Sequence, residues 1–143
     1  MLWKKIIIFL FVKTINPRIK LKYANRFAFD FNSNTLFYCF DVEDIGFLRH
    51  MRECHLWEPQ FDIVLYCLLH ELGHYFMQDS VASNEKEIRA AFSLVPLEVV
   101  VNNEKLQDAY YNLESEFEAT EWAIEFSRKH KWICKFLNGL LTI

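Results

Sequence analysis

The chain has 143 residues, the length of one ordinary domain with little room for a second core. Apolar residues make up 52% of the sequence and charged residues 24%, a composition that excludes a disordered chain. The formal net charge is −3 and there is no dense cationic run, so we expect no direct nucleic-acid partner. Residues 1–143 are therefore predicted to form a single globular domain.

The first apolar segment, residues 6–12, follows two lysines and ends at Lys13. It is far shorter than the roughly 20 residues that a membrane-spanning helix needs. No small-residue cleavage site of a signal peptide follows it. Its β-branched residues favour a buried strand. The cysteines form no CxxC pair and lie in apolar stretches, which predicts reduced, buried thiols at Cys39, Cys54, Cys67 and Cys134. We expect a cytoplasmic protein with no membrane partner.

A β-hairpin is predicted next, over residues 25–42, because apolar and polar residues alternate on either side of the turn Asn32-Ser33-Asn34. A short strand is expected over 97–101, after Pro96. Helical spacing of apolar residues predicts helices over 44–57, 60–78, 84–93, 103–129 and 132–137. The last of these is expected to end at Gly139. Because the strands come mostly before the helices, the predicted fold class is α+β.

The central helix, residues 60–78, contains an HExxH motif formed by His70, Glu71 and His74. Residues four apart share a helix face, so both imidazoles can bind one metal ion. Glu71, one step further on, is poorly placed as a ligand of that ion but can take a proton from the water that the metal activates. Gly73 is unfavourable inside a helix, which indicates that another chain segment approaches its backbone closely. The alternative interpretation is a pair of hydrogen-bonded core histidines.

A zinc enzyme needs a third protein ligand, and the acidic helix over 103–129 offers four candidates, Glu114, Glu116, Glu118 and Glu121. A ligand-bearing helix commonly presents a polar group one turn on that supports the site. Four residues after Glu116 lies Thr120, which can hydrogen-bond without adding charge. Glu116 also shares its face with two alanines that allow close helix packing. We therefore predict Glu116 as the third ligand supported by Thr120, with Glu118 as the remaining alternative.

These two segments together resemble the ImmA/IrrE family of zinc metallopeptidases. The resemblance covers residues 60–130 and rests on the HExxH motif followed by Glu116-Phe117-Glu118-Ala119-Thr120-Glu121-Trp122-Ala123. The family's second motif is a Glu, two residues, Ala, usually Asn or Asp, one residue, an aromatic and Ala. The resemblance implies that His70, His74 and Glu116 bind Zn²⁺ and that Glu71 is the general base. Thr120 departs from the usual Asn or Asp, which implies a weaker or rearranged supporting hydrogen bond.

The resemblance implies a zincin-like arrangement, in which the glutamate-bearing helix packs against the HExxH helix. The small N-terminal sheet with its hairpin, predicted from the residue pattern, precedes both helices. The resemblance also implies a cytoplasmic zinc endopeptidase, a hydrolase whose protein substrate is a helix-turn-helix repressor of a phage or mobile element. Two alternatives stay open. One is a module of the same fold that binds a repressor without cutting it and holds a structural zinc. The other is a closed structural zinc site completed by Cys67 or His55.

Overall fold

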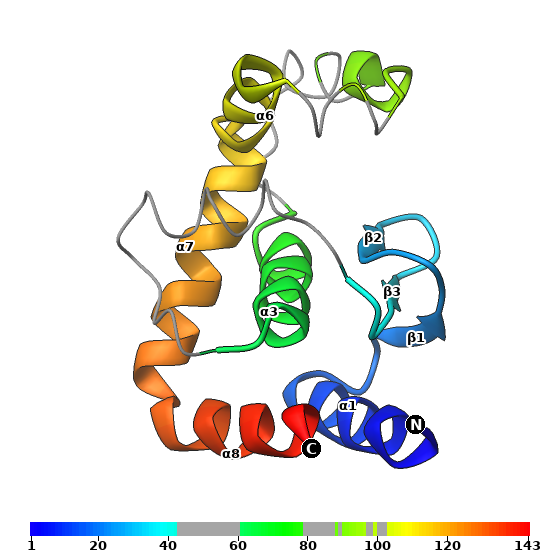
Figure 1. Ribbon diagram of the computed structural model, residues 1–143, viewed down its shortest axis with the longest axis vertical. Coiled ribbons are helices and arrows are strands. Elements are labelled where there is room, and N and C mark those ends of the chain that lie inside the picture. Colours follow the sequence, from blue (N-terminus) through cyan, green and yellow to red (C-terminus); the bar gives the residue numbers. More distant parts are fainter. Residues whose placement is uncertain (43–60, 79–87, 89, 97–98, 100–102) are drawn as a thin grey trace.

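A computed structural model describes residues 1–42, 61–78, 88, 90–96, 99 and 103–143. The described part is α+β, as predicted, with a small sheet near the N-terminus on one side of a group of helices (Figure 1). The strands are β1 (Lys20–Tyr23), β2 (Ala28–Asp30) and β3 (Thr35–Tyr38). The helices are α1 (Leu2–Ile15), α3 (Ile63–Phe76), α6 (Glu104–Tyr111), α7 (Glu114–Lys129) and α8 (Lys131–Thr142).

The predicted hairpin is confirmed. Strands β2 and β3 pair in antiparallel fashion, with Phe29 opposite Leu36. Asn34 closes the turn with φ 55°, a left-handed conformation that asparagine tolerates better than most residues. Strand β1 was not predicted; it pairs in parallel with β3, which gives the order β1-β3-β2. Its short sequence alternates two exposed lysines with less polar residues, which is typical of an edge strand.

The prediction of a buried strand over residues 6–12 is wrong, because this segment lies within helix α1. Only Ile8 and Val12 of this segment are buried, four residues apart on one helix face, and Ile6, Phe9 and Leu10 are exposed. A short apolar run does not distinguish a strand from a buried helix. The helix ends at Ile15, since Asn16 precedes Pro17 and adopts an extended conformation. Over the described residues, no helix combines the length and hydrophobicity needed to cross a bilayer.

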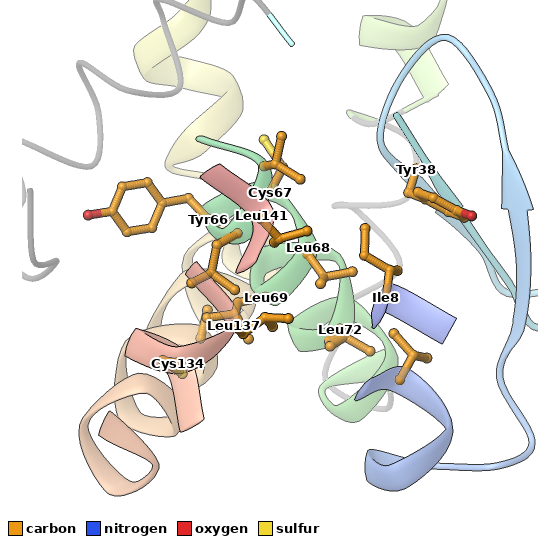
Figure 2. Close-up of a cluster of buried hydrophobic side chains, with 14 of the residues drawn as sticks. Ile8, Tyr38, Tyr66, Cys67, Leu68, Leu69, Leu72, Cys134, Leu137 and Leu141 are labelled. Carbon is orange, nitrogen blue, oxygen red and sulfur yellow. The ribbon is translucent and has the colours of Figure 1, made fainter. Parts of the chain in front are cut away.

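Helix α3 is central, as predicted (Figure 1). It lies between α7 on one side and the sheet on the other, and it also contacts α8. It begins at Ile63 because the side chain of Asp62 accepts a hydrogen bond from the backbone amide of Val64 and caps the first turn. Its buried leucines form the middle of the apolar core, with residues of α1 and α8 around them (Figure 2).

Three of the predicted thiols, Cys39, Cys67 and Cys134, are buried as expected, and Cys54 lies outside the described residues. Burial raises the pKa of the Cys134 thiol to about 11. A thiol with so high a pKa stays protonated at neutral pH and is a poor nucleophile. Cys134 therefore acts as a small apolar core residue.

In the C-terminal half, the positions where helices begin and end differ from the prediction. The helix expected over 103–129 is two helices, because Leu113 turns into the core with an extended backbone and separates α6 from α7. Helix α8 continues through Gly139 instead of ending there. The predicted helix over 84–93 is helical at its described residues, 88 and 90–93. Val99 is helical, which contradicts the predicted strand at that residue; the helix over 44–57 lies outside the described residues.

Helices α3 and α7 lie in close contact at Gly73, as the sequence indicated. A methyl group on Gly73 would lie 2.8 Å from the Cα atom of Ala119 and closer still to its carbonyl oxygen. Both partners are backbone atoms, which do not move aside as a flexible side chain does. The absence of a side chain at position 73 therefore sets the distance between the two helices.

We predict that Gly73→Ala lowers the free energy of unfolding by about 1–3 kcal/mol, because overpacking outweighs the gain in helix propensity. Gly139 is the matched control, since a methyl group there meets no atom within 4 Å. Gly139→Ala should raise the free energy of unfolding by about 0.5–1 kcal/mol. Chemical denaturation of both variants measures these changes. Equal effects of the two substitutions would contradict the close helix contact.

Candidate metal centre

The candidate metal centre lies between α3 and α7. Helix α3 contributes two histidines and helix α7 contributes one glutamate. His70 and His74 lie on consecutive turns of α3 and are 4% and 5% exposed. Glu116 lies in the first turn of α7 and is 1% exposed. A carboxylate is favoured at this end of a helix, where the unpaired backbone amides carry partial positive charge. The three side chains that the sequence singled out as metal ligands are thus buried on facing helices.

The ligand atoms of these three residues converge. Glu116 Oε2 lies 2.7 Å from His70 Nε2 and 3.3 Å from His74 Nε2. The two imidazole rings stand almost perpendicular, at 87°, with their centroids 4.8 Å apart. Glu71 is half-buried, and its carboxylate offers an oxygen that lies within 4.8 Å of the histidine nitrogens. A group of two imidazoles and a carboxylate in this arrangement can bind a metal ion.

These distances can be compared with the size of a zinc site. A tetrahedral ion about 2.0–2.1 Å from each ligand atom holds two ligand atoms about 3.3–3.4 Å apart. The separation between His74 Nε2 and Glu116 Oε2 already has this value. The separation between His70 Nε2 and Glu116 Oε2 is that of a hydrogen bond and has to widen by about 0.6 Å. Nitrogen and carboxylate donors in this arrangement fit Zn²⁺.

The electrostatics of Glu116 favour a charged carboxylate despite its burial. Burial alone raises the pKa of this carboxyl group, but His74 and His70 beside it lower the pKa more strongly, to well below its usual value. A buried carboxylate is costly unless a cation or hydrogen-bond donors compensate it. The imidazoles supply that compensation in the structure, and a bound cation would supply it equally.

Thr120 lies one turn beyond Glu116, as predicted for a supporting residue, and it is buried. Its Oγ1 atom lies 3.1 Å from Nδ1 of His70. An imidazole that holds a metal through Nε2 carries its proton on Nδ1, and the hydroxyl oxygen of Thr120 can accept that hydrogen bond. Thr120 therefore fixes the orientation of the His70 ring, although it replaces the asparagine or aspartate of the motif.

The other residues that the sequence offered as metal ligands differ from Glu116 in their burial or surroundings. Glu114 and Glu121 are exposed and Glu118 is only partly buried, so Glu116 is the most buried of the four acidic candidates on α7. Cys67 packs among the apolar core residues (Figure 2), which favours the interpretation as a buried thiol over that as a ligand. His55 lies outside the described residues.

Sequence reasoning did not identify Tyr75, which connects the site helix to two other elements. Its hydroxyl accepts a hydrogen bond of 2.9 Å from the side-chain amide of Asn16. Its ring packs on Phe29 of strand β2, with the centroids 5.5 Å apart. Both contacts join residues far apart in the sequence, so no local pattern could have revealed them. Tyr75 follows His74 directly and therefore connects the hairpin to the turn of α3 that carries the second histidine.

Comparisons of the chain with models of protein families, with curated protein sequences and with solved structures find no match.

We predict that Glu116→Ala abolishes stoichiometric zinc binding, whereas Glu118→Ala leaves it unchanged. The reason is that the Glu116 carboxylate lies against both imidazoles and the Glu118 side chain is partly exposed one half-turn away. Metal analysis of the purified variants after dialysis against zinc tests this. Loss of zinc in Glu118→Ala alone would show that the wrong glutamate has been assigned.

A second prediction concerns Thr120. Thr120→Val keeps the shape of the side chain but removes the oxygen that faces His70, so zinc affinity should fall by about 10- to 100-fold. Thr120→Ser retains the hydroxyl group and should bind zinc within a few-fold of the parent. Competition with a chromogenic chelator measures the affinities. If the valine variant binds zinc as tightly as the serine variant, Thr120 does not support the ligand.

Proposed function

We propose that this protein is a zinc-dependent endopeptidase. The observation that carries the proposal is the convergence of two imidazoles and one carboxylate at a buried point, with a second, half-buried carboxylate beside them. Three protein ligands leave one position of a tetrahedral ion for water or substrate, which is the arrangement of catalytic rather than structural zinc sites. The resemblance of the two motifs to the ImmA/IrrE peptidases supports the same conclusion.

In this proposal each residue has one role. His70, His74 and Glu116 would hold the ion, and Thr120 would orient His70. Zinc would supply a Lewis acid that polarises the scissile carbonyl and makes water acidic enough to be activated at neutral pH. Glu71 would take the proton of the attacking water on its carboxylate and return it to the leaving amine. Because Glu71 is half-buried, its carboxylate would be reachable from the substrate side.

The hairpin is the proposed border of the substrate cleft. Strand β2 packs against α3, and no described strand pairs with its outer edge. Extended peptides commonly bind by adding a strand to such an edge, where main-chain hydrogen bonds position the scissile bond. The contact between Phe29 and Tyr75 would place this edge beside the metal-binding turn. A bound peptide that lies away from β2 would contradict this placement.

The substrate that we propose is a helix-turn-helix repressor of a phage or mobile element, cleaved in the cytoplasm. The support for this class is the resemblance of the two motifs and the absence of a dense cationic run that would let the chain act on DNA directly. The effect on transcription would then be indirect, through removal of the repressor.

Glu71→Gln separates cleavage from binding. The substitution keeps the size of the side chain and removes the base, so zinc content and stability should stay near those of the parent. Cleavage should fall by about 10²–10⁴-fold, the usual contribution of general-base catalysis. The assay incubates the repressor encoded beside the gene with the parent, with the variant, and with the parent plus a chelator.

The outcomes of this experiment are distinct. Retained zinc with bound but uncleaved repressor supports the peptidase. If Glu71→Gln relieves repression in cells at the parent's strength, the protein acts by binding alone and the zinc is structural. If the variant loses its zinc, Glu71 is a fourth ligand and the site is closed.

A further inference from the structure

The net charge of −3 is the sum of parts of the chain with opposite charge: both ends are basic and the middle is acidic. Residues 1–29 hold seven basic and no acidic side chains, and residues 126–143 hold four basic and no acidic ones. All nineteen acidic side chains therefore lie within residues 30–125, which hold only five basic residues. Such a separation produces an electric field that the net charge does not describe.

The fold brings the two basic ends of the chain together. Helices α1 and α8 lie at the same end of the molecule, far from α6 (Figure 1). The ammonium group of Lys5 in α1 lies 3.8 Å from the ring centre of Tyr23 in β1. The ammonium group of Lys4 donates a hydrogen bond of 2.7 Å to the backbone carbonyl of Leu141. Ile8 and Val12 of α1 share one core cluster with Cys134, Leu137 and Leu141 of α8.

Helix α8 has a second apolar face that this core does not cover. Its buried residues recur at positions 134, 137 and 141, whereas Trp132 and Phe136 lie on the opposite side and are 82% and 70% exposed. Ile133 beside them is 51% exposed. An exposed tryptophan and phenylalanine one turn apart are unusual on a helix whose other apolar face already fills the core.

Helix α1 repeats this arrangement. Ile8 and Val12 are buried, and the face away from them carries exposed apolar side chains at Leu2, Ile6, Phe9 and Leu10. Of the seventeen large apolar side chains that are exposed among the described residues, ten lie within residues 1–15 or 131–143. The exposed apolar surface is therefore concentrated on the same two helices as the positive charge.

The basic side chains of these helices lie against aromatic rings. The ammonium group of Lys135 lies 5.8 Å from the ring centre of Trp132, and that of Lys4 lies 5.4 Å from the ring centre of Trp3. Tryptophan rings next to lysines are typical of protein surfaces that bind at the interface of a bilayer. The rings lie where the headgroups meet the acyl chains, and the ammonium groups lie near the lipid phosphates.

We propose that the exposed faces of α1 and α8 form a docking surface for an anionic membrane, called here the α1–α8 surface. It is defined by Leu2, Trp3, Ile6, Phe9, Leu10, Trp132, Ile133 and Phe136, with the exposed Lys131 and Lys135 of α8. The helices would lie in the plane of the bilayer surface rather than cross it. This inference does not rest on the metal centre, and it replaces the expectation of no membrane partner.

The chemistry of the surface favours a lipid partner over the other possible occupants. A second copy of the chain would bring two basic surfaces against each other, and like charges at an interface are unfavourable. A nucleic acid would match the lysines but would leave Leu2, Ile6 and Ile133 without an apolar partner. An anionic bilayer satisfies both features, because lysines near it gain from its negative potential and apolar side chains gain from burial.

The test is sedimentation of the full chain with vesicles of phosphatidylcholine alone or with about one third phosphatidylglycerol. The parent should bind the anionic vesicles at least about tenfold more strongly than the neutral ones, and high salt should weaken this binding. The double variants Trp132→Gln/Phe136→Gln and Lys131→Gln/Lys135→Gln should each reduce binding by about tenfold or more.

Matched controls lie on other parts of the surface. Leu94 is 86% exposed and Lys105 lies on α6, so Leu94→Gln and Lys105→Gln should bind as the parent does. Circular dichroism should show all variants folded, because the changed side chains are exposed.

Three results would overturn the proposal. The first is no binding to anionic vesicles, or equal binding to both vesicle types. The second is dimerisation, measured by light scattering, that Trp132→Gln/Phe136→Gln abolishes in a chain that does not bind vesicles. The third is binding to a DNA duplex, without binding to vesicles, that the lysine variant loses and the aromatic variant keeps.

Discussion

The close contact between α3 and α7 at Gly73 is the constraint on which the rest of the site depends. With no side chain at position 73, the backbone of Ala119 lies directly against α3. This approach allows the short side chain of Thr120 to reach His70 and lets Glu116 reach both imidazoles. A wider separation would need longer side chains and would admit water. The close packing of the two helix backbones therefore determines which side chains can meet at the site.

Burial at this contact explains why the ionisable groups depend on one another. A carboxylate that is 1% exposed is stable only beside donors or cations, and the imidazoles of α3 provide them. The start of α7 also favours this pairing, since Glu116 lies in its first turn. The partial positive charge of the backbone amides there favours the carboxylate.

The sequence could predict this part of the structure because the relevant signals are local. The spacing of His70 and His74, the cost of Gly73 in a helix, and the small residues beside Glu116 all lie within two short segments. Other features depended on contacts between distant segments. Within the helix that residues 6–12 form, Ile8 and Val12 share one core with residues of α8, and Leu113 is buried at the break between α6 and α7.

The candidate metal centre and helix α8 lie at opposite ends of α7. Glu116 is in the first turn of α7, whereas α8 begins directly after its last residue, Lys129. At 1.5 Å per residue the two ends are about 20 Å apart, beyond the reach of any side chain and well beyond the Debye length at physiological salt. A lipid bound at α8 would thus lie too far away to contact the proposed ligands, whereas the hydrogen bond from Asn16 to Tyr75 links the end of α1 to the residue that follows His74.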